Sequence, residues 1–178
     1  MRDIRALFLA LLVMGCSQLP ESQTSEGGES QTPDRVIWNG RIEVTEGGKL
    51  KSVIRAGKIS TFEKRKITEL DSGVVVDFYN KQGIHSSTLT SQRAKVEEVT
   101  DLFMAQGDVE VVSDSGATLR SERLYWDRKE RRIRSDTLVI MTTEYDSLRG
   151  FDFEAEEDLT SWRLQRPTGQ TFRRVGKP

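Results

Sequence analysis

An internal repeat of thirty residues constrains the fold of this chain more than any other feature of its sequence. A shift by that number aligns two segments that share apolar, small and basic positions. The aligned positions are Leu89–Arg93 with Leu119–Arg123, Val96 with Trp126, Phe103 with Ile133, and Val109–Val111 with Val139–Met141. Repeats of roughly twenty to fifty residues are typical of stacked supersecondary units, each of which buries its apolar face only against its neighbours. The repeat therefore predicts a stack of short, similar units.

Short runs of β-branched residues, separated by turn signals, indicate that these units are made of strands. The runs are Ile42–Val44, Val74–Phe78, Asp108–Val112 and Thr137–Met141. The turn signals are Glu46–Gly48, Asp71–Gly73, Asn80–Gly83, Asp114–Gly116 and Asp127–Glu130. Turns that recur about every ten residues, without a sustained helical period, predict an all-β domain.

One segment has the spacing of a helix instead. Val96, Val99, Leu102 and Phe103 would fall on one helical face. The repeat aligns this segment with a later one that contains the hairpin turn at residues 127–132. We therefore predict a strand, a turn and a strand here as well.

The N-terminus has the features of an export signal. Arg2 and Arg5 precede an apolar run from Ala6 to Met14, and Gly15 is followed by Cys16, the only cysteine. The run is too short to cross a bilayer, which needs about twenty apolar residues, and it fits the apolar region of a signal peptide. A small residue before a lone cysteine resembles the lipobox of bacterial lipoproteins. An ordinary secretion signal is the alternative.

These features divide the chain into four parts. Residues 1–15 are a predicted lipoprotein signal peptide, and Cys16 is the predicted lipid anchor. Residues 16–34 comprise this cysteine and a polar segment rich in Ser, Gln, Glu, Gly and Thr, which predicts a flexible tether. Residues 35–170 form the predicted folded domain, and residues 171–178 a C-terminal tail.

Composition argues against several classes of function. The 27 basic and 28 acidic side chains nearly cancel, which argues against nucleic acid as a partner. His85, the only histidine, lies beside Ser86 and Ser87 without the pattern of a nucleophile, and a lone histidine is a poor basis for a metal site. Asp152 and Glu154 are one strand period apart, which is common by chance. We expect no catalytic residues, no metal and no cofactor.

Two charged clusters have alternative interpretations. The basic residues at 128–134 are expected to form a solvated hairpin turn, and the alternative is contact with phosphates of a lipid head group. The acidic residues at 154–158 are expected to form a solvated loop, and the alternative is a site that holds a cation between sugar phosphates.

The ordered series of strand segments resembles the LptC family. The matching segments are Gly107–Val112, Gly116–Asp127, Arg134–Ile140 and Leu148–Phe153. The resemblance implies a twisted, open β-jellyroll of repeated antiparallel strand pairs, related to LptA and OstA-like proteins. It implies lipopolysaccharide as the ligand, and an inner-membrane Lpt ABC transporter and an LptA-like periplasmic bridge protein as partners. Many relatives have an uncleaved transmembrane helix, and here a lipid on Cys16 would replace it.

Strand periodicity and this resemblance together predict two sets of site residues. Residues that line a lipid-binding interior are expected at Val76, Phe78, Phe103, Val109, Val111, Leu119, Trp126, Ile133, Val139, Met141, Phe151 and Phe153. Edge strands that pair with partners are expected at Arg35–Val44 and Leu159–Arg166, with apolar residues Ile37, Ile42, Val44, Leu159, Trp162 and Leu164. Pro167 is expected to end pairing on the last strand. The alternatives are a filled sandwich core and ordinary edges shielded by charge.

The predicted function is non-enzymatic carriage of lipopolysaccharide in the periplasm by a membrane-anchored lipoprotein, with the inner membrane favoured over the outer. A structural envelope lipoprotein is the alternative, and an enzyme acting on envelope glycans is the third hypothesis. A scaffold should have a solidly filled interior, whereas a carrier should have an apolar groove.

Overall fold

The computed structural model describes residues 32–171, which form one antiparallel sheet of 11 strands. The predicted signal peptide, the anchor at Cys16, most of the tether and residues 172–178 lie outside the described residues. The strands are β1 (Arg35–Glu46), β2 (Lys49–Phe62), β3 (Ile67–Tyr79), β4 (His85–Ser91), β5 (Arg93–Glu97), β6 (Leu102–Ser113), β7 (Thr118–Asp127), β8 (Arg132–Ser135), β9 (Val139–Thr142), β10 (Asp146–Glu156) and β11 (Trp162–Thr171). Over this range no helix is long and apolar enough to span a membrane.

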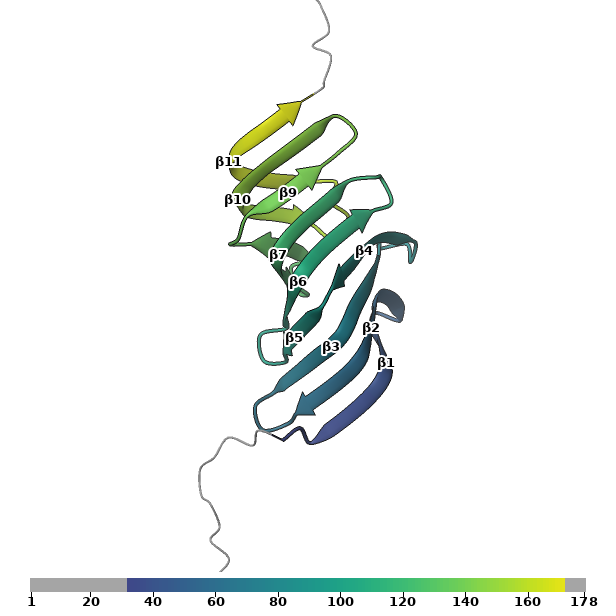
Figure 1. The fold of residues 1–178 in the computed structure, drawn as a ribbon. Coiled ribbons are helices and arrows are strands. Elements are labelled where there is room, and N and C mark those ends of the chain that lie inside the picture. Colours follow the sequence, from purple (N-terminus) through teal and green to yellow (C-terminus); the bar gives the residue numbers. More distant parts are fainter. Residues whose placement is uncertain (1–31, 172–178) are drawn as a thin grey trace, which may run out of the picture.

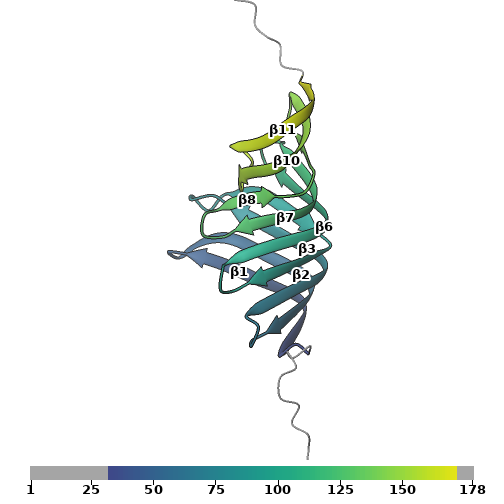
Figure 2. The ribbon, with the colours of Figure 1, turned by 90° about the vertical axis from the view of Figure 1, so that its left-hand side faces the viewer.

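The strands lie across the long axis of the molecule, so that β1 and β11 are at opposite ends (Figures 1 and 2). Neighbours in the sheet follow the order of the chain. Two long strands are replaced by shorter pairs: β4 and β5 both lie between β3 and β6, and β8 and β9 both lie between β7 and β10. The predicted all-β fold, a twisted open jellyroll of antiparallel strand pairs, is confirmed.

Bulges at the middle of the strands divide the sheet into two halves that face each other. On β3, Ser72 and Gly73 both lie opposite Gly57 of β2, and on β6, Gly107 and Asp108 both lie opposite Glu122 of β7. These bulged residues have positive φ angles, between 45° and 82°. A bulge adds local twist and bends its strand, so a row of bulges creases the sheet. We call this row the crease.

The crease corrects one prediction from the sequence. Asp71–Gly73 reads as a turn, yet it lies inside β3, which continues to Tyr79. Gly and Asp favour turns because they tolerate positive φ, and a bulge selects the same residues for the same reason.

The thirty-residue repeat forms continuous apolar ladders across the sheet. In one half the paired residues are Ile42, Ile54, Val76, Leu89, Val111, Leu119, Met141 and Leu148. In the other half they are Thr68, Val96, Phe103, Trp126, Ile133, Ala155 and Trp162. The segment from Val96 to Phe103 is β5, a turn and the start of β6, as the repeat predicts. Each repeat thus adds two residues to each ladder.

Candidate functional site

The interior between the two halves contains the predicted lipid-binding residues, with one exception. Eleven of the twelve are buried in one hydrophobic cluster: Val76, Phe78, Phe103, Val109, Val111, Leu119, Trp126, Ile133, Val139, Met141 and Phe153. Phe78 from one half meets Trp126 from the other edge-to-face, with ring centroids 4.7 Å apart, and Phe103 lies 5.6 Å from the same indole. The two halves therefore bury their apolar faces against each other. Contact of these residues with lipid stays a prediction.

Phe151 is the exception, because its side chain lies on the outer surface. It is 45% exposed, whereas Phe153 is 1% exposed. Phe151 and Phe153 would share a face in a regular strand, but Asp152 has a φ of 50° and the pairing with β11 shifts on both sides of Phe151. This irregularity reverses the alternation, so only Phe153 points inward.

Burial of the interior decreases toward both ends of the molecule. In the middle the ladder residues are almost fully buried. Ile42 and Val44 on β1, and Trp162 and Leu164 on β11, pack against the same cluster but are only partly buried. The apolar interior is thus filled at its centre and incompletely covered at its two ends.

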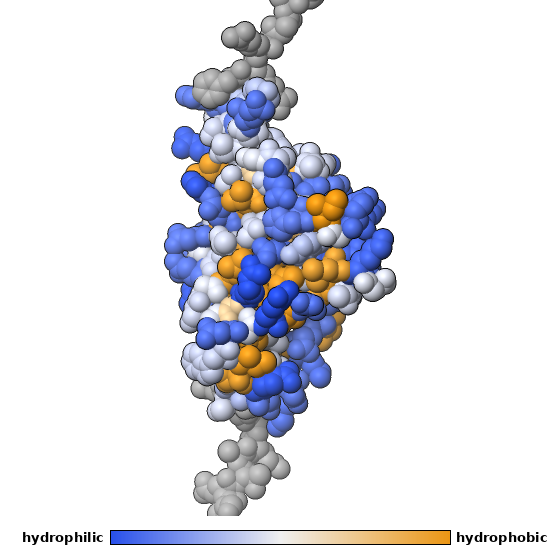
Figure 3. Space-filling model, turned by 90° about the vertical axis from the view of Figure 1, so that its right-hand side faces the viewer, coloured by the Kyte–Doolittle hydropathy of each residue, from blue (hydrophilic) through white to orange (hydrophobic). Residues whose placement is uncertain are grey.

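The edge strands β1 and β11 each pair with one neighbour in the described sheet. Of the predicted edge residues, Ile37, Ile42 and Val44 lie on β1, and Trp162 and Leu164 lie on β11. Trp38 on β1 is 68% exposed, with Lys58 Nζ 5.7 Å from its ring centroid. The face seen in Figure 3 is mostly hydrophilic, with apolar patches scattered along the long axis.

Two details of the last edge differ from the prediction. Leu159 does not lie on the edge strand: it is buried in the turn between β10 and β11, where its amide donates to the Glu156 carbonyl (3.0 Å). Pairing does not end at Pro167, because β11 continues to Thr171. The pairing of β10 with β11 changes register between Gln165 and Thr168, and Pro167, which has no N–H, lies at this irregularity opposite Gly150. Pairing resumes at Thr168, opposite Arg149.

The open side of the jellyroll, which we call the mouth, lies between the hairpin turns of the two halves. It is bridged by further contacts of an ion pair that joins two turns of the same half. Arg131, in the turn between β7 and β8, pairs through Nη2 with Glu157 Oε2, in the turn between β10 and β11. Arg131 Nη2 also donates to the carbonyl of Tyr79 (3.0 Å), at the end of β3 in the opposite half. Ser87 Oγ of β4 donates to the carbonyl of Glu157 (2.6 Å). The turns of one half are thereby connected to strand ends of the other.

Glu157 is the most buried acidic side chain of the mouth, with a relative exposure of 5%. Trp126 Nε1 donates a hydrogen bond of 2.8 Å to its Oε1. Burial raises the pKa of Glu157, although Arg131, the indole N–H and Lys51 each act to lower it. The free-energy cost of removing this carboxylate from water therefore exceeds the stabilisation that its partners give to the charged form.

Sequence reasoning missed this ion pair. Both residues belong to clusters that were expected to be solvated: Arg131 to the basic turn, and Glu157 to the acidic loop. Glu154–Glu156 instead complete β10, and Glu157 turns into the mouth. No local pattern distinguishes Glu157 from its acidic neighbours, because its burial depends on strands that are distant in sequence.

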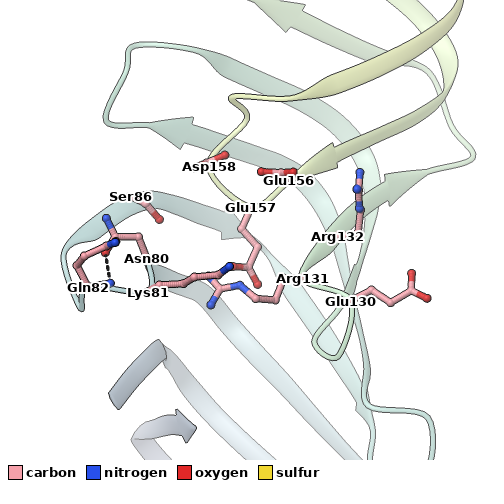
Figure 4. A pocket seen from close by; sticks show the side chains of 10 residues that line it. All are labelled: Asn80, Lys81, Gln82, Ser86, Glu130, Arg131, Arg132, Glu156, Glu157 and Asp158. Carbon is pink, nitrogen blue, oxygen red and sulfur yellow. Dashed lines mark hydrogen bonds and ion pairs between the residues drawn. The ribbon is translucent and has the colours of Figure 1, made fainter. Parts of the chain in front are cut away.

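Two cavities flank the ion pair. One, of about 410 Å³, lies toward β1 and is lined by Val44, Ser52, Lys51, Asp101, Trp126, Arg128, Lys129 and neighbouring residues. The other, of about 380 Å³, lies toward the turn after β3 and is lined by Asn80, Lys81, Ser86, Arg132, Glu156, Asp158 and neighbouring residues. Arg131 and Glu157 line both. In Figure 4 these two side chains point toward each other, while Glu130 points away.

The histidine has a more organised environment than its sequence context indicated. His85 Nδ1 lies 3.0 Å from Asp114, and Nε2 lies 3.1 Å from Thr88 Oγ1. The Thr88 hydroxyl donates to Asp77 Oδ1 (3.1 Å). Because its proton is directed to a carboxylate rather than to the imidazole, this hydroxyl is not arranged as a nucleophile.

Among residues 32–171, no group of three or more His, Cys, Asp or Glu side chains is placed to hold a metal ion.

Comparison with known proteins gives one result. A family model described as lipopolysaccharide-assembly, LptC-related, matches residues 4–167. No curated protein matches the chain.

Proposed function

The chain belongs to the LptC-related family of lipopolysaccharide-assembly proteins, and we propose that it is a non-enzymatic carrier of lipopolysaccharide. The resemblance predicted from the sequence is confirmed by this match. Membership indicates a role in lipopolysaccharide transport within the cell envelope. The members of this family are known as transport components rather than as enzymes. In our proposal the protein receives lipopolysaccharide from an inner-membrane ABC transporter and passes it to the next β-jellyroll, an LptA-like bridge protein.

The observation that carries the proposal is the apolar ladder from Ile42 to Leu148, which spans the sheet from one edge strand toward the other. Acyl chains that lie along it would be shielded from water over its whole length. Each buried CH₂ contributes about 0.8 kcal/mol, so acyl chains need no polar site to bind. Since the centre of the interior is filled, acyl chains must displace side chains or separate the two halves there.

The edges support handover between proteins. An edge strand has unpaired N–H and C=O groups that can accept another strand, and the partly buried apolar residues beside it would be covered at the same time. We propose that β1 pairs with the transporter and that β11 pairs with the bridge protein. Strand pairing at either end would extend the apolar interior into the neighbour.

The anchor is proposed from the sequence. A lipid on Cys16 followed by a polar segment of eighteen residues would hold the domain near the membrane in place of a transmembrane helix. A flexible segment of that length reaches on the order of 25 Å, so the domain can stand clear of the lipid surface. Because the transporter is in the inner membrane, we favour anchoring there.

Photo-crosslinking in cells tests the carrier function. A photoreactive residue at Met141, which is fully buried on the interior face, should crosslink to lipopolysaccharide. The matched control is Ile140, the preceding residue on β9, whose side chain is 44% exposed on the outer face. Crosslinking at Met141 and not at Ile140 supports the proposal. Its absence at both Met141 and Val111 would contradict it.

A structural envelope protein is the second candidate, and the filled centre of the interior is the observation that favours it. Depletion of the protein in cells separates the two. Lipopolysaccharide that accumulates at the inner membrane supports a carrier. Normal delivery to the cell surface, together with a mechanically weakened envelope, supports a scaffold.

A further inference from the structure

The mouth is held closed by contacts that converge on Arg131 and Glu157, which we call the latch. Glu157 lies in one turn and receives Ser87 from the opposite half through its backbone carbonyl. Arg131 lies in another turn and donates to Tyr79, also in the opposite half. Movement of either turn away from the opposite half requires these contacts to break. The latch therefore controls access to the interior at the middle of the mouth.

The cavity of about 410 Å³ beside the latch is both basic and apolar. Its charged lining has four cations, Lys51, Arg128, Lys129 and Arg131, against three carboxylates, Glu46, Asp101 and Glu157. Its apolar lining includes Val44, on the interior side of β1, and Trp126, in the middle of the ladder. A charged group held at the rim would thus lie directly above a path into the apolar interior.

Polar atoms without hydrogen-bond partners lie in the same cavity. Among the described residues, Ser52 Oγ and Arg131 Nη1 are buried and make no hydrogen bond, whereas Glu157 Oε2 has only its ion pair with Arg131 Nη2. Ser52 is fully buried, and its hydroxyl can donate to an acceptor. Buried polar groups are nearly always hydrogen-bonded, so two potential donors without an acceptor point to an anionic ligand.

We propose that this cavity binds the phosphate of a phosphorylated amphiphile, and that the phosphate opens the mouth by replacing Glu157 as the partner of Arg131. The inference rests on the proposed function, in which the ligand is lipopolysaccharide. A phosphate forms charge-assisted hydrogen bonds with a guanidinium as a carboxylate does, and it offers more acceptor oxygens. Once Arg131 binds the phosphate, Glu157 loses its ion pair and only the longer-range interaction with Lys51 is left, so its turn separates from β4. The acyl chains then pass Val44 and Trp126 into the interior.

The cavity on the other side of the latch does not suit an anion. Its lining has three cations, Lys81, Arg131 and Arg132, against four carboxylates, Glu130, Glu156, Glu157 and Asp158. The phosphate therefore approaches Arg131 from the side of β1, and Arg132 takes no part in its binding.

Binding of diphosphoryl lipid A, compared with dephosphorylated lipid A that has the same acyl chains, tests the proposal. Wild-type protein should bind the phosphorylated form more tightly. Glu157→Gln removes the competing carboxylate while its amide oxygen can still accept from Trp126. This variant should bind diphosphoryl lipid A about tenfold more tightly, the factor that one charge-assisted hydrogen bond commonly contributes.

Arg131→Gln and a matched control complete the test. Arg131→Gln should lose the preference for the phosphorylated form. Arg132→Gln, one residue away and paired only loosely with Glu154 (3.7 Å), should leave both affinities unchanged. An unchanged affinity of Glu157→Gln, or a preference that persists in Arg131→Gln, would overturn the latch.

Hydrogen exchange in the turn at residues 157–161 provides a readout that does not depend on the variants. In wild-type protein, diphosphoryl lipid A should accelerate exchange of the amides of this turn, because the turn separates from β4. The dephosphorylated form should accelerate this exchange less. Equal exchange with both forms would contradict the proposal. If wild-type protein binds neither form, the carrier function itself fails, and if it binds both equally, only the latch fails.

Discussion

Substitution of Gly57 by Ala tests whether the crease depends on the close approach of β2 and β3. Gly57 lies opposite the bulge of β3, and a Cβ at this position would lie 2.7 Å from Ser72 Cβ and 2.8 Å from the Ser72 carbonyl oxygen. Ordinary contacts of a Cβ begin near 3.4 Å. Both atoms belong to or adjoin the backbone, so no change of rotamer relieves the overlap. The strands must instead separate by more than half an ångström at the point where the sheet bends.

The expected cost follows from this overlap. Overpacking by one carbon atom commonly costs about 1–3 kcal/mol, and a clash with backbone belongs near the upper end of that range. The lower conformational entropy of an unfolded chain with Ala returns roughly 0.5–1 kcal/mol. We therefore expect Gly57→Ala to lower the free energy of unfolding by about 2 kcal/mol. Urea unfolding followed by circular dichroism measures this change as a shift of the midpoint at constant slope.

A second glycine provides the control. Gly83 has a φ of +80°, but a Cβ there would meet nothing within 4 Å. Gly83→Ala therefore has only the cost of the left-handed conformation, about 1–2 kcal/mol, less the same entropy return of roughly 0.5–1 kcal/mol, without a steric clash. If Gly57→Ala leaves stability unchanged, the close approach of the strands does not maintain the crease and our account of it is incorrect.

Three further outcomes follow from the structure. Phe153→Ala should lower the free energy of unfolding by about 3–5 kcal/mol and Phe151→Ala by less than about 1 kcal/mol in the same urea assay, and equal effects would contradict their assigned sides. Because burial raises the pKa of Glu157 above its unfolded value, its contribution to stability is present at low pH and is lost as the pH rises through the raised pKa. Acidification from neutral pH should therefore shift the stability difference between wild type and Glu157→Gln in favour of wild type, and a difference independent of pH would refute the shift. Trp38→Ala should change the free energy of unfolding by no more than about 0.5 kcal/mol yet reduce co-purification with the transporter, and normal co-purification would exclude Trp38 from that interface.

The repeat predicted the fold well because register and burial are linked in a sheet. Once Val96 is aligned with Trp126 and Phe103 with Ile133, the alternation of strands determines which residues share a face. These four residues form one continuous ladder in the structure. The segment around Val99 forms strands despite its helical spacing, because a repeated unit adopts the same structure in each copy.

Bulges account for two of the predictions that were wrong. A single irregular residue reverses the alternation of a strand, and nothing in the local sequence separates it from a turn residue. Asp71–Gly73 was assigned to a turn, and Phe151 to the interior, because both segments contain such residues. The partners of Glu157 were beyond prediction for a different reason. They come from β4, β7 and the turn after β7, and only the folded sheet brings these together.

The filled interior agrees with a carrier once the energetics of exchange are considered. In an empty groove, acyl chains would gain the full free energy of burial, about 0.8 kcal/mol for each CH₂, and would bind too tightly to be passed on. In the proposed carrier they would replace contacts that Trp126 makes with Phe78 and Phe103, so the net gain would be only the difference between two apolar environments. A ligand with such a small net free energy of binding can move from one ladder residue to the next without a large barrier. In the proposed handover, the partly buried residues at β1 and β11 would continue the same environment into a neighbouring protein, so acyl chains would cross the edge without meeting water.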